Sequence, residues 1–519
     1  MPRQAAKWKG FSADEPNVIL PLATSYNERG PNGYVASITN GIDQRKVNCF
    51  YEPIQNSQTG KTTLYLRKRI GIIAGTALAV TVTTYRPYLM ETQPDNGTLP
   101  WVIGLSGIST VATNSVASTN VLASTNMWPG FVDSTVISGI QHVVLQIVYD
   151  SPSGSDRTFY ASTLSGFTEI GDANYSTFIH RGKMEHMDGY GFQMVSSNRI
   201  HNSHLNTLSS WPLTNYITKS IEQDYAAGLA RLGRTILSFG IETVEGFYNA
   251  GNPVGSPLGR IPGMSARYGL GYASISKGSG NISARHYYTT IGKVMYFLGT
   301  ESQPYKTDTS GSGLYAFDGS QFGKVSTPAI DRILSRPTGT GVVYNVCKMQ
   351  VAGDLAVAIA LTAPNAATQV WLIYMPRLKE WFEWNSTAVQ PVSNGHFVAG
   401  IGGTSNSVKY HIPTVTGNWT DGSGASYTLS YQFKLPRSGS QTKRMQMAGL
   451  IADTSSTVSV AQMAVSRDDY ASFEADRDID MQKVRKEIFR LGAYRDLSIR
   501  ISHSSNADFR AESFIARVE

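Results

Sequence analysis

The residues that could carry chemistry in this sequence are few, and the first candidate resembles a phosphate loop. The segment Thr59–Thr63, TGKTT, contains a Gly-Lys-Thr, but a phosphate loop needs a glycine five positions before Gly60, where Gln55 stands. The residues that follow, TTLYL, are typical of a strand, whereas a bound phosphate needs a helix N-terminus. We therefore predict a hairpin turn here and no nucleotide site.

Histidines form the second group of candidates. Among nine histidines the only close pairs are His180 with His186 and His201 with His204. The sequence contains no HExxH, and no carboxylate stands at a spacing that would make a zinc site specific. The second pair lies in the polar segment NRIHNSHLN, so we predict solvated loop histidines there, with chance metal coordination as the alternative.

Acidic residues and tryptophans complete the candidates. A local acidic run contains Asp468, Asp469, Glu474, Asp476, Asp478 and Asp480. A glycosidase places two carboxylates across a sugar, and a calcium loop needs a central glycine that this run lacks. We expect a solvated surface here. Trp381 and Trp384 could stack on sugars, but packing inside a β-sheet repeat is the preferred interpretation. The sequence thus predicts no catalytic residue, no cofactor and no metal site.

Composition favours a large β protein without structural disulfides. The 519 residues include 49 glycines, which suit tight turns, and 27 tyrosines, which suit pleated sheets. Cys49 and Cys347 are predicted to be buried small hydrophobes. The net charge of +7 permits contact with nucleic acid without requiring it, and the cluster Arg67–Arg69 is interpreted as a charged strand end. The apolar stretch Ile70–Tyr85 is too short for a membrane helix and reads as a buried β segment.

Period-2 alternation predicts many strands, and recurring turn glycines predict a repeat. Leu237–Ile241, Val357–Leu361 and Leu497–Ile501 alternate as strands with one buried face do. Two segments, 221–232 and 481–491, are the best helix candidates. Turn glycines open successive units at Gly75, Gly139, Gly189, Gly233, Gly292, Gly353 and Gly395. The intervals overlap the length of propeller blades, so we predict an all-β, propeller-like domain of about seven blades, with a set of β-sandwiches as the alternative.

Three regions follow from this pattern. Residues 1–70 would form an N-terminal arm and first strands, residues 71–412 the propeller, and residues 413–519 a C-terminal β domain. The polar, glycine-rich Gly417–Gly424 marks the second boundary. Within the propeller, Ser106–Asn126 is interpreted as loop or edge strand.

Several ordered segments resemble the packaged-DNA stabilisation proteins of short-tailed bacteriophages, also called head-to-tail hub or tail nozzle proteins. Val47–Ile72, with its N-x-F…L-x-x-R-x-G run, is similar to their N-terminal part. Leu229–Gly263 resembles their most recognisable segment, G-R…FG…T-x-E…Y-x-x-G, and Gly313–Leu334 resembles the blade that follows. Phe489-Arg490-Leu491-Gly492 stands where the family has its closing strand, one arginine short. Residues 75–130 match nothing in the family and could be an insertion.

The resemblance implies a homo-hexameric ring below the portal and its adaptor protein, with a tail fibre, spike or needle protein at its flank or lower end. Double-stranded DNA would pass through its channel without sequence-specific binding, and the ring would retain the packaged genome. A modest net charge suits a conduit, because tight phosphate binding would oppose release. The expected place is the virion tail, assembled in the bacterial cytoplasm, with no stable insertion into a membrane.

Two other classes remain open from the sequence. A carbohydrate-binding or carbohydrate-cleaving propeller, such as a tailspike or a secreted lectin-like protein, would need an acidic pair and aromatic side chains converging on one pocket. Another virion scaffold protein, such as a capsid decoration or fibre component, would share the same β-rich composition. The tail hub is the preferred interpretation, and an enzyme is not expected.

Overall fold

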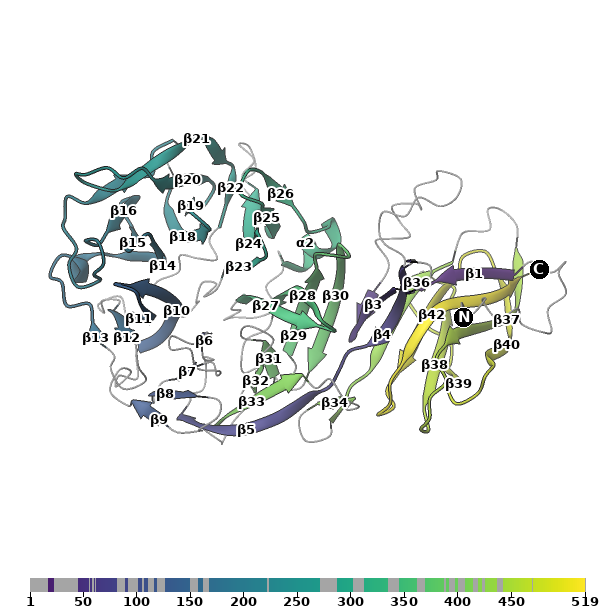
Figure 1. Cartoon of the computed structure of the whole chain (residues 1–519). Coiled ribbons are helices and arrows are strands. Elements are labelled where there is room, and N and C mark those ends of the chain that lie inside the picture. The colour runs from purple at the N-terminus through teal and green to yellow at the C-terminus, as the bar shows by residue number, and fades with distance from the viewer. Residues whose placement is uncertain are drawn as a thin grey trace.

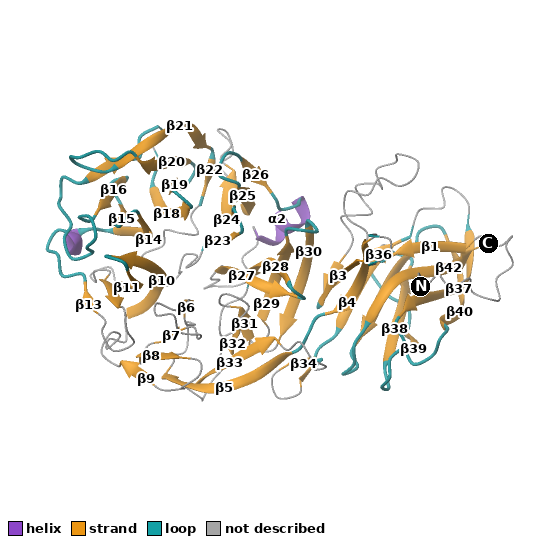
Figure 2. Ribbon diagram, viewed as in Figure 1, coloured by secondary structure: helices purple, strands orange, loops and turns teal. Residues whose placement is uncertain are grey.

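The computed structural model is almost entirely β and has two parts, a propeller and a β-sandwich (Figures 1 and 2). The described residues are 17–22, 45–55, 57, 60, 62–81, 89–91, 101–104, 107–110, 116–118, 127–149, 157–161, 168–221, 224–270, 287–301, 312–334, 345–361, 369–386, 389–391, 397–399, 407–413, 419–421, 425–435, 442–468 and 470–518.

Seven small antiparallel sheets follow one another around a ring, as the blades of a propeller do (Figure 1). In chain order, blade 1 contains β6 (Leu89–Glu91), β7 (Trp101–Gly104), β8 (Gly107–Thr110) and β9 (Val116–Ser118); blade 2 contains β10 (Met127–Ile137), β11 (Ile140–Tyr149), β12 (Arg157–Ala161) and β13 (Thr168–Glu169); blade 3 contains β14 (His180–Met187), β15 (Tyr190–Val195), β16 (Arg199–Asn202) and β17 (Tyr216–Thr218).

The next three blades are antiparallel as well. Blade 4 contains β18 (Ala226–Leu232), β19 (Thr235–Gly240), β20 (Val244–Asn249) and β21 (Leu258–Ala266); blade 5 contains β22 (Tyr268–Gly269), β23 (Tyr288–Ile291), β24 (Val294–Glu301), β25 (Ser312–Phe317) and β26 (Phe322–Lys324); blade 6 contains β27 (Asn345–Val351), β28 (Asp354–Ala360), β29 (Gln369–Met375) and β30 (Glu380–Ser386). The described helices are short: η1 (Tyr175–Thr177) and α2 (Pro328–Leu334).

Blade 7 closes the ring with a strand from the other end of the propeller sequence. Its strands are β31 (Val389–Pro391), β32 (Phe397–Ala399), β33 (Ser407–Pro413) and β5 (Ile72–Thr81), and β5 pairs antiparallel with β33. The first propeller strand therefore completes the last blade. Through this pairing, β5 becomes the outer strand of blade 7 (Figure 1). Strand β5 lies in the apolar segment that we predicted to be β structure.

The predicted turn glycines explain how the blades begin. Gly139, Gly189, Gly233, Gly292 and Gly353 all follow the first strand of a hairpin and have positive φ, between 58° and 90°. Glycine reaches this conformation without the steric penalty of a Cβ, which is why it marks tight hairpins. Gly75 instead lies within β5, and Gly395 lies outside the described residues. The prediction of an all-β fold with about seven blades is confirmed.

The second part is a sandwich of two sheets that joins both ends of the chain. One sheet contains β1 (Asn17–Pro21), β3 (Cys49–Gln55), β4 (Thr62–Lys68), β37 (Lys443–Ala452), β40 (Lys486–Tyr494) and β42 (Arg510–Val518). The facing strands are β2 (Arg45–Val47), β36 (Leu429–Lys434), β38 (Val460–Ser466), β39 (Arg477–Asp480) and β41 (Ser498–His503). A separate hairpin, β34 (Thr420–Asp421) and β35 (Ala425–Ser426), lies in the segment predicted as a boundary.

The propeller and the sandwich share one sheet. Strand β2 pairs in parallel with β30 of blade 6 and antiparallel with β36, so a nine-stranded sheet runs from β27 to β39. One hydrophobic core accompanies it, because Trp371 and Phe382 of blade 6 are buried with Tyr431 and Ile501 of the sandwich. The alanines of β28 face this core, while Val357 and Ile359 face blade 5, so both faces of that strand are buried.

Both helix predictions are wrong. Residues 226–232 form β18 and residues 486–494 form β40. In each segment the apolar residues could satisfy either period, and pairing with a neighbouring strand decided the outcome. The interpretation of Ser106–Asn126 as loop or edge strand agrees with β9, an edge strand, but not with β8, which pairs with both β7 and β9.

Candidate functional site

A polar cluster connects the inner strands of blades that are not neighbours. The Tyr288 hydroxyl on β23 donates to Glu185 Oε1 on β14 at 2.5 Å, and Lys183 Nζ donates to the same hydroxyl at 3.3 Å. Lys183 Nζ also lies 3.7 Å from Glu185 Oε1. Strands β14 and β23 belong to blades 3 and 5, with β18 of blade 4 between them. Side chains of such blades meet only near the propeller axis, which places the cluster there.

Two glycines bring the inner strands close enough for this contact. A Cβ added at Gly182 would lie 2.5 Å from the Cα of Gly228 on β18, well inside van der Waals contact. The Tyr287 hydroxyl fills the remaining space and donates to the carbonyl oxygen of Leu229. Burial raises the pKa of Tyr287 far above its usual value, so this hydroxyl keeps its proton and remains a donor.

The side chains of this cluster are suited to binding a polar ligand through hydrogen bonds. Glu185 is buried, with 2% of its surface exposed, and its carboxylate is held between an ammonium and a phenol. Cleavage of a glycosidic bond requires two carboxyl groups about 5–10 Å apart, and the cluster as described supplies one. The sequence interpretation missed these residues, because nothing in their spacing brings together side chains that are about 100 positions apart.

A second cluster, buried, lies where the propeller meets the sandwich, and it contains an arginine from the predicted charged strand end. Arg69 is completely buried, and its guanidinium forms a bidentate ion pair with Asp421, at 2.9 and 2.5 Å. The Arg69 guanidinium also lies 3.6 Å from the ring centre of Tyr427. Lys68 is buried as well, and only Arg67 of the three keeps appreciable exposure. The three residues do lie at the end of β4, as predicted, but Lys68 and Arg69 are buried in the junction.

Asp421 and Asn48 extend this junction network to the backbone of both parts. Asp421 accepts hydrogen bonds from the Ser386 hydroxyl at 2.7 Å and from the backbone N–H of Ile72 at 3.1 Å. The Asn48 side-chain oxygen accepts from Arg69 Nε at 3.0 Å and from the backbone N–H of Asn385 at 2.9 Å. Blade 6, the start of β5 and the sandwich are thereby joined through fully hydrogen-bonded charges.

Two further ion pairs support the seam between β2 and β30. Lys46 Nζ lies 2.5 Å from Glu380 Oε2, and both side chains are buried. Arg45 pairs with Glu383 through two hydrogen bonds, at 3.1 and 2.9 Å, at a more exposed position. The consecutive residues Arg45 and Lys46 thus contribute one partly exposed and one buried ion pair to the seam.

Three sequence motifs have the structural roles that we predicted: a hairpin at TGKTT, a packing tryptophan and two buried cysteines. Thr62–Lys68 is strand β4, paired with β3, and Gly60 has φ of +68° in the connection between them. Trp384 is buried and its indole N–H donates to the carbonyl oxygen of Cys49 at 2.8 Å, so it packs within the junction. Cys49 and Cys347 are both buried and unbridged.

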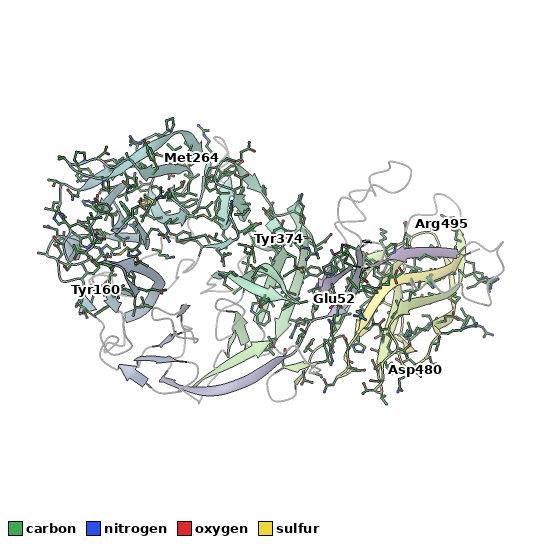
Figure 3. The ribbon with its side chains drawn as sticks, in the orientation of Figure 1. Glu52, Tyr160, Met264, Tyr374, Asp480 and Arg495 are labelled. Atoms are coloured by element: carbon green, nitrogen blue, oxygen red, sulfur yellow. The ribbon has the colours of Figure 1, made fainter. Side chains whose placement is uncertain are left out.

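The acidic run lies on the sandwich, and Asp480 is labelled there in Figure 3. Its members pair with arginines: Glu474 with Arg467 at 2.7 Å, and Asp476 with Arg500 at 3.0 Å. Hydrogen bonds from Ser472 and Ser466 lower the pKa of Asp468 to about 2. Asp469 lies outside the described residues. These contacts agree with a charged, solvated surface.

The prediction of solvated loop histidines is wrong for His201. It lies in β16 with 4% of its surface exposed, while His204 is exposed in the connection that follows. His180 and His186 are also buried, in β14. His201 packs on Phe178, with ring centres 4.2 Å apart, and on Tyr216, at 5.3 Å. The short polar segment concealed a strand whose alternate residues face an aromatic core.

Acid is expected to destabilise the protein through two buried histidines, His201 and His503 of β41. Burial, assisted by Arg199, lowers the pKa of His201 to about 4, and burial, assisted by Lys68, lowers that of His503 to about 3. Because the unfolded chain binds these protons near pH 6.5, stability is complete above that pH and falls as the pH drops towards 4. Each histidine contributes at most about 1.4 kcal/mol per pH unit. Urea unfolding between pH 7.5 and 4 measures this slope, and it should be shallower in His201→Phe; an unchanged slope would contradict the assignment.

Comparisons with known proteins give no family for this chain. No family model matches it, and no curated protein matches it. Similar solved structures include a chain of a mitotic checkpoint complex, at 9% identity over 66% of this chain and 93% of that chain, with a TM-score of 0.37. An ancestral GH74 enzyme is 12% identical over 70% of this chain and 54% of that chain, with a TM-score of 0.39. The computationally designed Ika8 protein is 8% identical over 64% of this chain and 99% of that chain, with a TM-score of 0.33. Likenesses at these scores carry no conclusion about activity or partners.

The fold itself defines the class: an all-β protein in which a seven-bladed propeller is joined to a β-sandwich through a shared sheet. Within the described ranges, no three histidine, cysteine, aspartate or glutamate side chains gather as metal ligands would. A helix with the length and apolarity to cross a membrane is likewise not found in that part of the chain.

Proposed function

We propose that this chain is a structural subunit of a bacteriophage tail, a nozzle or hub protein that forms a homo-hexameric ring. The ring would extend the portal channel, retain the packaged DNA and conduct it during ejection. Its partners would be a portal or adaptor protein above, and a fibre, spike or needle protein at the flank or below. The subunit would act in the virion tail after assembly in the bacterial cytoplasm, and it would have no enzymatic activity.

The observation that carries the proposal is the continuity between propeller and sandwich. The nine-stranded sheet passes from blade 6 into the sandwich, and the junction network of Arg69, Asp421 and Asn48 holds the two parts with hydrogen-bonded charges. A hinge between domains has few contacts across it, so this junction favours a rigid subunit. Rigidity suits a ring that must resist the pressure of packaged DNA, and the ordered sequence resemblance points to the same class.

The axial cluster bears on where DNA would pass. Lys183, Glu185 and Tyr288 make contact across blades 3 and 5, so charged and polar side chains cover the inner edge of blade 4. We place the conduit between subunits, with each propeller as part of its wall or as a docking body. A cyclic ring with heterologous contacts forms such a channel when the rotation closes.

Negative-stain microscopy and mass photometry of the purified full-length chain test the proposal. The expected result is sixfold rings or short tubes with a mass six times that of one chain, either alone or after addition of a candidate portal or adaptor protein. Trimers would contradict the hub and indicate a spike. Monomers that bind glycans would contradict it as well.

The axial cluster favours one alternative, a propeller that binds carbohydrate. A buried carboxylate beside an ammonium and a phenol is a suitable group for orienting sugar hydroxyls, and binding sites often combine a few such polar groups. A glycan array with the native protein and with Glu185→Gln tests this alternative. Specific glycan binding that is lost in the variant would support it, whereas absence of binding in the native protein leaves the tail subunit as the proposed function.

A further inference from the structure

Strand β1 occupies an acceptor site that several distant segments build together. All five of its residues pair antiparallel with β42, from Asn17 opposite Arg517 to Pro21 opposite Ser513. The chain then enters the core through Leu22, of which 1% is exposed. Its backbone N–H donates to the carbonyl oxygen of Glu512 at 3.0 Å. We call the paired edge of β42 and the pocket around Leu22 the β1 site.

Two tyrosines fix the inner end of the β1 site. The hydroxyls of Tyr51 on β3 and Tyr431 on β36 both donate to the carbonyl oxygen of Leu22, at 3.2 and 2.5 Å. Both side chains are buried, and burial raises their pKa well above the usual value, so they remain protonated donors. If β1 left the site, the two buried hydroxyls would lose their shared acceptor and the paired groups of β42 would lose their partners, which is costly. The site therefore needs a strand to fill it.

The opposite edge of the same sheet is closed by arginines. Arg477 of β39 donates from Nη1 to two carbonyl oxygens of β40, those of Phe489 and Arg490, at 2.9 and 3.1 Å. Arg467 donates to the carbonyl oxygen of Leu491 at 2.7 Å and also to that of Ala493. These side chains use the acceptors that an added strand would need, a common protection of sheet edges. Strand addition is thus directed to β42 and away from β40.

The link between β1 and the rest of its chain does not dictate which copy it fills. Residues 23–44 separate Leu22 from Arg45, and a chain of that length can span as much as about 70 Å when extended. The same strand can therefore reach its own β42 or that of a neighbouring subunit with the same hydrogen bonds. Exchange of an identical element between protomers loses no contacts, which makes it a low-cost route to assembly.

We infer that β1 is exchanged between subunits, so that residues 17–22 of each chain fill the β1 site of the next copy around the ring. This inference rests on the proposed ring and deepens it by naming the contact that links its members. Each subunit gives one strand and receives one, which is the head-to-tail relation that a closed ring requires. The ligand of the site is thus the N-terminal strand of a second copy of this chain.

Cysteine cross-linking tests the exchange. Ile19 and Ile515 lie directly opposite each other in the β1–β42 pairing, and the native Cys49 and Cys347 are buried. In Ile19→Cys/Ile515→Cys protein, treated with a mild oxidant or a short bis-maleimide, exchange predicts a ladder of covalent multimers on denaturing gels. A product that consists only of internally linked monomer would overturn the inference. The single variant Ile19→Cys is the matched control and should give no ladder.

Microscopy of the same samples separates this inference from the proposed function. Sixfold rings with a ladder support both, and sixfold rings with internally linked monomer overturn the exchange while the ring stands. A ladder in particles of another symmetry supports exchange and overturns the hexameric hub. As a second variant, Leu22→Asp places a charge in the buried pocket and should abolish the ladder and the multimers. Multimers that persist in folded Leu22→Asp protein would also overturn the exchange.

Discussion

Alanine in place of Asp421 is expected to lower the free energy of unfolding by about 3–5 kcal/mol, because it leaves the buried guanidinium of Arg69 without its counter-charge. Arg69 is fully buried and Asp421 nearly so, and water cannot replace the lost carboxylate without opening the junction. The substitution should destabilise both the propeller and the sandwich. Asp421 also accepts hydrogen bonds from the Ser386 hydroxyl of blade 6 and from the backbone N–H of Ile72 at the start of β5. Chemical unfolding followed by tryptophan fluorescence measures the change.

The matched control for this substitution is Arg45→Ala, in the nearby seam between β2 and β30. Arg45 pairs with Glu383, but 58% of its side chain is exposed, so water screens the pair and takes its place. We expect a loss of at most about 1 kcal/mol. Equal losses for the two variants would show that the junction network does not hold the two parts together, and would remove the main support for a rigid subunit.

The second large effect is expected for Gly182→Ala on the inner strand of blade 3. Gly182 has φ of +65°, a conformation that disfavours any residue with a Cβ by about 1–2 kcal/mol. The added methyl group would also lie 2.5 Å from the Cα of Gly228 and 3.0 Å from the Tyr287 hydroxyl. Backbone cannot move aside as a side chain does, so overpacking adds about 1–3 kcal/mol more. Thermal unfolding should show a clear decrease in the melting temperature.

Gly233→Ala isolates the backbone contribution. Gly233 has φ of +58°, close to that of Gly182, but a Cβ there would meet nothing within 4 Å. Its loss should therefore be about 1–2 kcal/mol, the conformational part alone. If Gly182→Ala were no more destabilising than Gly233→Ala, the close approach of β14 and β18 would be relaxed in solution, and the axial cluster would not be held as described.

Much of the fold follows from local patterns. Alternation in segments such as Leu497–Ile501 and Val357–Leu361 predicted strands that the structure contains as β41 and β28. The turn glycines predicted the repeat, because a tight hairpin needs positive φ at one position and that demand is local. Five of the seven glycines identified lie at such turns.

Other features could not be read in this way, because they depend on partners far along the chain. The segments 221–232 and 481–491 were predicted to be helices, and the pairing of β18 with β19 and of β40 with β37 overrode that preference. His201 was taken for a loop residue, although β15 and β17 flank its strand and an aromatic core covers its side chain. The axial cluster was missed because Glu185 and Tyr288 meet only once the blades are arranged around the axis.

The sequence by itself determined the class of the fold: all β, about seven repeated blades and a further β domain, since periodicity and turn chemistry are properties of neighbouring residues. Only the tertiary structure decided how the ring closes and how its parts are joined. Closure by β5 and the pairing of β2 with β30 depend on which strand edges meet. The burial of Arg69 against Asp421 depends on two residues 352 positions apart. Such contacts leave no local signature, because the free energy that selects them comes from burial in the assembled core.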